Sequence, residues 1–250
     1  MVMKNFLNKI YFIITYFLIR KKIHNTDSYL LHSKMAFKAN NKIIKNLKLK
    51  NSFKTPKDLT IVSYHSYDYK PLFEKNMDFL GLKYTTIKAE TPYFFTKKIE
   101  VIYSMIKGKH IKTKYVLVCD SDDVIFTKNP KSIIEVFESF DCDILFCSTD
   151  WDFIHGKTND IIPQNLCIKN QRDWVTTVMG QKKYLNAGAF IFKTDDVYDI
   201  FEESVKYISY ENSILEIPYG DCDQTIYRWI EPDFYPRIKV DYENRLFTRI

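Results

Sequence analysis

The chain has 250 residues, of which 46% are hydrophobic and 16% aromatic, and it holds only 6 glycines and 8 prolines. Such a chain can bury one sizeable core, and its composition argues against a repeat, linker-rich or disordered protein. The net charge of +6 is unevenly distributed: residues 1–58 hold 13 Lys and Arg against two acids, and residues 59–250 hold 24 Lys and Arg against 29 acids. The main part of the chain therefore lacks a basic stripe that could bind phosphates, and no nucleic-acid partner is expected.

Residues 1–57 are expected to form a basic, amphipathic helical arm. The apolar run ends at Ile19, short of the roughly 20 residues that a membrane-spanning helix needs, and is followed by three basic residues instead of a signal-peptide cleavage site. We expect residues 1–22 to lie on a membrane surface with their basic flank toward anionic lipid. The alternative is docking of the same face on the main domain or on another subunit. This face comprises Phe6, Leu7, Ile10, Ile14, Phe17 and Leu18.

From residue 58 to residue 250 the pattern alternates and indicates a second domain. Helical spacing occurs at 70–81, 96–109, 130–140 and about 195–207, with a short helix after "YGDCD" at 219–223. Between these lie strand-like runs at 59–66, 83–89, 115–120, 142–149, 184–193 and 237–241. The alternation predicts an α/β fold with a mostly parallel central sheet covered by helices on both faces. The stretch from 150 to 183 is polar and gives no clear element.

The five cysteines are odd in number and have no CxxC spacing. Three of them lie in or beside apolar, strand-like runs. We therefore expect buried, reduced thiols in a cytoplasmic protein, and neither a disulfide framework nor a zinc site.

The stretch "YVLVCDSDDVIF" at 115–126 places Asp120, Asp122 and Asp123 where a buried strand ends. In open α/β sheets ligands bind beyond the carboxyl ends of the strands. Adjacent carboxylates repel, so a positive group is expected among them, and Mg²⁺ or Mn²⁺ bridging to a diphosphate is one such group. A rival interpretation is a haloacid-dehalogenase-type phosphatase with Asp120 as nucleophile, although that strand normally comes first in its domain. No glycine-rich phosphate loop follows any strand.

Three further segments decide between these interpretations. "KKYLNAGAFIFKTDDVYDIF" (182–201), "YGDCDQTIYRWI" (219–230) and "IKVDYENRLF" (238–247), together with 115–126, resemble the glycosyltransferase domain of the procollagen lysyl hydroxylases and its bacterial and viral relatives. The resemblance runs in consistent order from about residue 59 to 250. It implies a GT-A fold and a metal-dependent transfer of a hexose from a UDP-sugar to an acceptor hydroxyl. The acceptor classes are a glycan, a lipid-linked saccharide or a protein, and the basic arm favours polysaccharide biosynthesis at a membrane.

The resemblance also implies a role for each matching position. Asp223 and Asn186 would be catalytic, next to the transferring sugar, and Asp120, Asp123 and Asp241 would be the metal ligands. The expected nucleotide-sugar-binding residues are Ser63 and Tyr64 for the nucleoside, Lys97 or its neighbour Lys98 for the phosphates, and Asp122, Trp151, Gly188 and Gln224 around the donor.

One position departs from the family pattern. The family's third metal ligand is a histidine after an Asp on the last strand, and here that pair is Asp241-Tyr242. A protonated tyrosine is a poor ligand, so Asp241, Asp122 or water would have to replace it. Structural alternatives stay open for other residues: Asp223 as a helix N-cap, Lys97 as a solvated helix residue, and Trp151 as packing. A non-catalytic nucleotide-sugar or membrane-binding module is a further alternative for the whole chain.

Overall fold

The computed structural model describes residues 44, 52–89, 95–150, 164–208 and 222–248. The chain divides into two compact units, residues 1–46 and 47–250, and the fold below is that of the second. The predicted membrane-surface helix lies outside the described residues, as does Trp151. Within the described ranges, no helix combines the length and the apolar character needed to cross a membrane.

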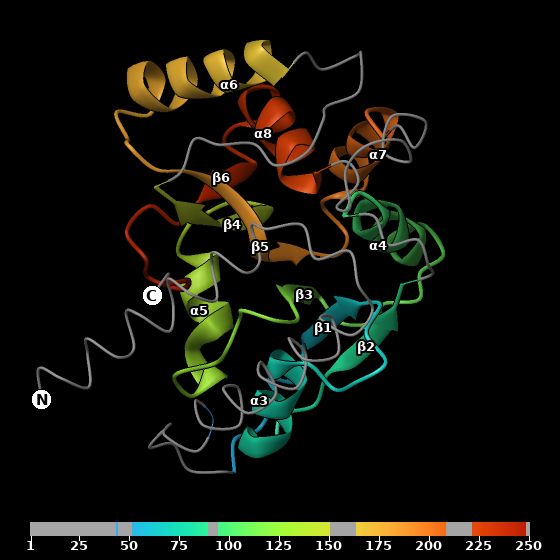
Figure 1. Ribbon diagram of the computed structural model, residues 1–250. Helices are drawn as coiled ribbons and strands as arrows, with labels where there is room; N and C mark the ends of the chain where they lie inside the picture. The colour runs from blue at the N-terminus through green and yellow to red at the C-terminus, as the bar shows by residue number, and fades with distance from the viewer. Residues whose placement is uncertain (1–43, 45–51, 90–94, 151–163, 209–221, 249–250) are drawn as a thin grey trace, which may run out of the picture. The chain divides into compact units, whose positions relative to one another are not determined.

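A six-stranded sheet forms the centre of the unit (Figure 1). Its strands, in the spatial order β2-β1-β3-β5-β4-β6, run parallel except β5, which is antiparallel to both of its neighbours. The predicted mostly parallel α/β sheet is therefore confirmed. The strands are β1 (Leu59–His65), β2 (Thr85–Lys88), β3 (Tyr115–Asp120), β4 (Ile144–Thr149), β5 (Tyr184–Lys193) and β6 (Ile238–Val240).

Helices connect and cover these strands. Most lie where the periodicity predicted them, and α3 ends as expected at Gly81, whose φ of 71° is a left-handed conformation that glycine adopts without strain. The helices are α3 (Leu72–Leu80), α4 (Lys97–Lys107), the 3₁₀ turn η1 (Pro130–Ser132), α5 (Ile133–Glu138), α6 (Gln164–Asp173), the π-helical turn η2 (Trp174–Val178), α7 (Tyr198–Lys206) and α8 (Asp223–Phe234).

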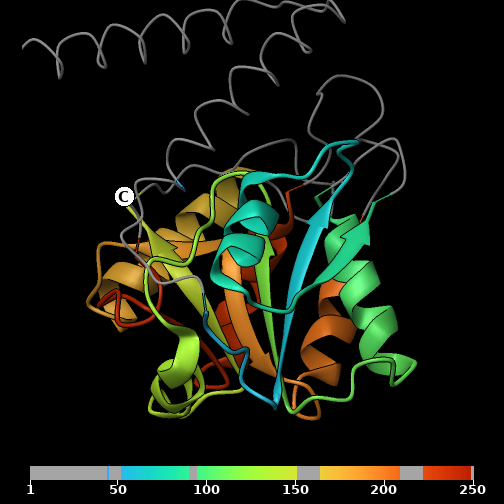
Figure 2. The ribbon, with the colours of Figure 1, turned by 90° about the horizontal axis from the view of Figure 1, so that it is seen from below.

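The sheet is buried on both faces, with the helices in two layers around it (Figure 2). Alternate residues of β3 point to opposite sides: Val116 and Val118 join the apolar cluster beneath α4, α7 and α8, whereas Leu117 and Cys119 join the cluster beneath α3 and α5. This two-sided burial explains why the strand sequences are continuously apolar.

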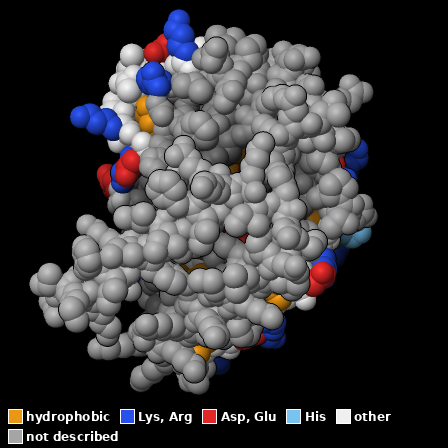
Figure 3. Space-filling view, viewed as in Figure 1, with side chains coloured by type: hydrophobic (Ala, Val, Ile, Leu, Met, Phe, Trp, Pro, Cys, Tyr) orange, Lys and Arg blue, Asp and Glu red, His pale blue; other side chains and the backbone are white. Residues whose placement is uncertain are grey.

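Two features were not predicted from the sequence. Helix α6 and the turn η2 occupy part of the polar stretch between β4 and β5, where no element was expected. Figure 3 shows side chains of both charges over α6, and Lys169, Arg172 and Asp173 are exposed there while Gln171 is buried. A helix with so few apolar residues has weak periodicity, which is why its sequence did not indicate it.

Candidate active site

The predicted site residues converge at the edge of the sheet where β1 and β3 end. Tyr64 pairs with Asp120 across β1 and β3, and Cys119 pairs with Ala189 across β3 and β5. The antiparallel β5 therefore brings the "LNAGA" segment directly beside the end of β3. Helix α8 begins at Asp223 and adds its first residues to the same place.

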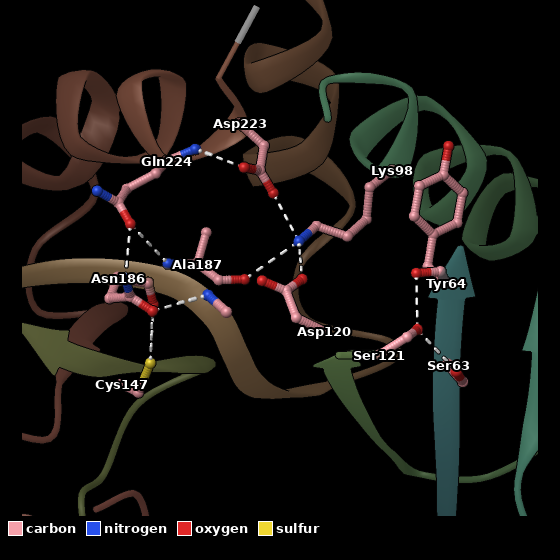
Figure 4. Close-up of polar contacts among 11 residues, drawn as sticks. Ser63, Tyr64, Lys98, Asp120, Ser121, Cys147, Asn186, Ala187, Asp223 and Gln224 are labelled. Carbon is pink, nitrogen blue, oxygen red and sulfur yellow. Dashed lines mark hydrogen bonds and ion pairs between the residues drawn. The ribbon is translucent and has the colours of Figure 1, made fainter. Parts of the chain in front are cut away.

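A buried lysine stands at the centre of this group (Figure 4). The Lys98 ammonium lies 2.9 Å from Asp120 Oδ1 and 2.8 Å from Asp223 Oδ2, and donates to the Ala187 carbonyl at 3.2 Å. The side chains of Lys98 and Asp223 are 1% and 5% exposed, whereas that of Asp120 is 33% exposed. The chain itself thus places one positive group, the Lys98 ammonium, between Asp120 and Asp223.

Asp223 is held from two sides. Its Oδ1 accepts a hydrogen bond from the backbone N–H of Gln224 at 2.8 Å, at the start of α8, while its Oδ2 faces Lys98. Burial raises the pKa of Asp223, and the Lys98 ammonium opposes that rise. The alternative of Asp223 as the helix N-cap is wrong, because Cys222 is the N-cap and Asp223 is the first residue of α8. Its place beside the transferring sugar stays a prediction.

Asn186 and Gln224 form a second set of contacts next to the first. Asn186 Nδ2 donates to Gln224 Oε1 at 2.9 Å, and Asn186 Oδ1 accepts from the Gly188 N–H at 2.9 Å and from Cys147 Sγ at 3.0 Å. The register of β4 with β5 shifts between Phe146 and Cys147, which marks a bulge. The amide of Asn186 is thus fixed in one orientation at the end of the sheet.

Gly188 is a close-approach position. A Cβ atom placed there would lie 2.9 Å from Asn186 Oδ1 and 3.2 Å from the Asp120 carboxylate oxygen Oδ2. The absence of a side chain at Gly188 is what lets Asp120 and Asn186 face each other across β3 and β5.

The predicted nucleoside residues lie on the other side of Asp120. Ser121 Oγ donates to the Tyr64 carbonyl at 2.9 Å and lies 3.0 Å from Ser63 Oγ. Ser63, Tyr64 and Ser121 are all buried. These bonds fix the turn after β3 against the end of β1, and so fix the direction in which the Asp-rich turn leaves the sheet.

Asp122 and Asp123 are exposed in that turn. Desolvation raises the pKa of Asp123, and the negative charges of Asp120 and Asp122 raise it further. Burial lowers the pKa of Lys75 on α3, and the negative charge of Asp122 opposes that lowering. The turn therefore presents closely spaced carboxylates to solvent beside the better shielded Asp120.

Asp241 has a different environment from the one expected of a metal ligand. Its side chain is fully buried and accepts three backbone hydrogen bonds, to Oδ1 from Arg245 at 2.9 Å and to Oδ2 from Leu246 and Phe247 at 2.7 and 2.8 Å. In this structure Asp241 therefore organises the turn after β6, and its role as a metal ligand stays a prediction. Within the described residues no three His, Cys, Asp or Glu side chains are grouped as a metal cluster.

Tyr242 belongs to a buried polar group on the far side of α8. Burial raises the pKa of Glu231 to about 7, against the lowering effects of Arg228, Trp174 and Tyr242. Gln171 Nε2 donates to Glu231 at 2.7 Å, and Arg228 Nε donates to the Leu185 carbonyl, one residue before Asn186, at 2.8 Å. This group ties α6, α8 and β5 together behind the site.

Lys97 differs from its neighbour. The Lys97 ammonium lies 3.0 Å from Glu100 on a partly exposed face of α4, whereas Lys98 faces the carboxylates. The helical phase carried a signal for this distinction, because Lys98, Ile102 and Ile106 recur at intervals of four and share the buried face.

The cysteines agree with the prediction of buried thiols among the described residues. Cys119, Cys142 and Cys222 are buried, Cys147 is partly buried, and these four are free.

Comparisons with known proteins give one family match and several similar structures. The family model described as the PLOD GT domain matches residues 68–212. Among solved structures, one similar chain is a glycosyltransferase involved in the glycosylation of the major capsid of PBCV-1, with 18% identity, a TM-score of 0.38 and coverage of 73% of this chain and 81% of the other. Another is 4-diphosphocytidyl-2C-methyl-D-erythritol synthase from Anaerococcus prevotii DSM 20548, with 9% identity, a TM-score of 0.36 and coverage of 77% and 91%. No curated protein matches.

Proposed function

Because this chain belongs to the family of PLOD glycosyltransferase domains, we propose that it transfers a hexose from a UDP-sugar to a hydroxyl group of an acceptor. The observation that carries the proposal is the convergence of Asp120, Asn186 and Asp223, from three separate segments, at the edge of the sheet where ligands of α/β folds bind. The donor nucleoside is proposed to lie toward Ser63 and Tyr64.

Asp120 and Asp123 are the residues proposed to hold a divalent cation, Mn²⁺ or Mg²⁺. The contact of Asp120 with Lys98 is made through Oδ1, and Asp123 is close enough for its pKa to respond to Asp120. Two carboxylates suit a hard cation that completes its shell with substrate phosphates and water. When bound there, the cation neutralises charge that develops on the leaving diphosphate.

The chain's own residues then have separable tasks. Asn186 and Gln224, each fixed by hydrogen bonds, offer amide groups to sugar hydroxyls. Gly188 permits the donor to approach the backbone of β5. Asp223 places a negative charge next to the reacting sugar, where positive charge develops at the anomeric carbon as its bond to the diphosphate weakens.

The acceptor is proposed to be a glycan, a lipid-linked saccharide or a protein, and the reaction to take place at the cytoplasmic face of a membrane. The basis is the sequence of residues 1–22, in which an apolar helical face is followed by Arg20, Lys21 and Lys22. A binding assay with vesicles that contain or lack anionic lipid, using the full chain, tests this part separately from the chemistry.

The activity is tested by a thermal-shift screen of nucleotide sugars with and without Mn²⁺, followed by measurement of UDP release. A ligand that binds the folded state raises the melting temperature through mass action. Asp120→Ala and Asp123→Ala are expected to abolish Mn²⁺-dependent turnover, and Asp195→Ala, in the exposed turn after β5, is the control for loss of an acid. Unchanged turnover in the first two variants would refute the proposed metal and donor site.

The phosphatase alternative makes an opposite prediction. It requires an acyl phosphate on Asp120, the aspartyl-phosphate, and hydrolysis of simple phosphate monoesters. The strand that ends at Asp120 is the third of the domain, and β5 next to it is antiparallel, so the chain order expected for such a nucleophile is not met. Trapping experiments that find no aspartyl-phosphate remove this alternative.

A further inference from the structure

Lys98 is unusual in being a fully buried lysine on an amphipathic helix. It is 1% exposed, and α4 carries it on the face that also buries Ile99, Ile102 and Ile106. Burying an ammonium is unfavourable unless it is paired and hydrogen-bonded. The burial of Lys98 at the centre of the site therefore has to be explained by its charged and polar partners and not by apolar packing.

The ammonium has three N–H groups, and three acceptors surround it. These are Asp120 Oδ1 at 2.9 Å, Asp223 Oδ2 at 2.8 Å and the Ala187 carbonyl at 3.2 Å. They come from β3, α8 and β5, which are separate in sequence. Two of these contacts are hydrogen bonds, to Asp120 and to the Ala187 carbonyl, and the third is an ion pair with Asp223, so the protein itself engages the ammonium from three segments.

The two carboxylates differ in exposure and in their proposed tasks. Asp120 is partly open and belongs to the cation and diphosphate side, while Asp223 is buried and belongs to the sugar side. Without a cation between them they would repel, and Asp223 would be a buried, uncompensated charge. The Lys98 ammonium, fixed between the two carboxylates, sets the distance between Asp120 and Asp223.

We propose that Lys98 is a positioning residue, which holds Asp223 in register with Asp120 and does not bind the phosphates of the donor. This inference rests on the proposed transferase function and adds a residue that acts through Asp223. It differs from the assignment that the family resemblance implies for the lysine at 97 or 98, namely direct contact with the phosphates.

The two assignments separate in a comparison of binding with turnover. In Lys98→Met, positioning predicts a kcat about 100-fold lower, the cost of a misplacement of roughly 1 Å. The Kd for UDP, measured by calorimetry with Mn²⁺ present, should stay within about threefold of wild type or become tighter. A phosphate-binding lysine predicts weaker UDP binding instead, and a larger loss of UDP affinity would overturn the proposal. Lys107→Met, at the exposed end of the same helix, controls for loss of a positive charge.

A double-mutant cycle with Asp223→Asn tests whether Lys98 acts through Asp223. If it does, Lys98→Met lowers kcat in the wild-type background but changes it by less than about twofold when Asp223 is already Asn. Losses that simply multiply would show that Lys98 acts independently, and the proposal would be wrong. Lys98→Arg, which keeps the charge in another geometry, should recover part of kcat.

Folding does not limit this test. Should Lys98→Met fail to fold, the variant Lys98→Met/Asp223→Asn removes the charge pair together and avoids the uncompensated carboxylate. Its UDP affinity then decides, since wild-type affinity supports positioning and loss of affinity overturns it. If the wild-type protein turns over no UDP-sugar, the transferase proposal itself fails. Wild-type turnover with UDP binding lost in the Lys98 variants refutes only the positioning role.

Discussion

Gly188→Ala is the substitution for which the geometry gives the most direct expectation. The new Cβ would lie 2.9 Å from Asn186 Oδ1, and ordinary contacts begin at 3.4 Å, so the Asn186 amide must retreat by the difference. That oxygen is held by the Gly188 N–H and Cys147 Sγ, and the same amide binds Gln224, so its displacement disturbs the whole set. A misplacement of a catalytic group by about 1 Å lowers the rate roughly 100-fold. A displacement of the Asn186 amide by about half of 1 Å therefore predicts about a tenfold loss in kcat, or about 1.4 kcal/mol in the activation free energy.

The assay is UDP release at saturating donor, combined with urea unfolding of both proteins. Overpacking near the site should also lower the free energy of unfolding by about 1–3 kcal/mol. Gly180→Ala is the matched control, because Gly180 has φ +61° but no atom within 4 Å of the position that a Cβ would take. It should lose about 1–2 kcal/mol of stability from its left-handed backbone and keep its turnover. A Gly188→Ala variant with wild-type kcat would refute the argument that close approach of β5 to Asp120 organises the site.

Two further predictions concern buried carboxylates. Asp241→Ala leaves three backbone N–H groups of residues 245–247 without their acceptor, so the free energy of unfolding measured in urea should fall by about 3 kcal/mol or more. The affinity for Mn²⁺ in the presence of UDP should stay near that of the wild type. A large loss of Mn²⁺ affinity would instead show that Asp241 is a metal ligand. The pKa of Glu231 is raised from 4.5 to about 7, so the folded state binds this proton more tightly than the unfolded state does. As the pH rises from 4.5 to 7, the free energy of unfolding of the wild type should therefore fall by up to about 3 kcal/mol relative to that of Glu231→Gln. Equal pH dependence of the unfolding midpoints of the two proteins would contradict that pKa.

The helix phase of α4 shows how far sequence reasoning reached into the site. The family resemblance implied a lysine near the donor phosphates and left Lys97 and Lys98 as alternatives. The spacing puts Lys98 on the apolar face of the helix with Ile102 and Ile106. Only the structure shows that Lys98 reaches Asp120 and Asp223 and that Lys97 pairs with Glu100.

The last strand shows the opposite case. The family resemblance implied that Asp241 is a metal ligand, which stays a prediction. Its actual partners are three backbone N–H groups of the turn that follows, and loop backbone geometry has no periodic signal in the sequence. Likewise, Tyr242 is directed toward Glu231, a residue of α8 eleven positions earlier, which no local pattern indicates.

The sequence alone determined the alternation of strands and helices, because burial on both faces of a sheet requires continuous apolar strands, and it determined that Asp120, Asp122 and Asp123 follow a strand end. Only the tertiary structure showed that Asp120 is paired with the Lys98 ammonium, which also contacts Asp223. The antiparallel insertion of β5 beside β3 brings the Ala187 carbonyl to Lys98 and Gly188 close to Asp120, and the start of α8 brings Asp223 to Lys98. These residues are far apart along the chain, so their electrostatic coupling through Lys98 arises from packing and is not encoded in any one segment.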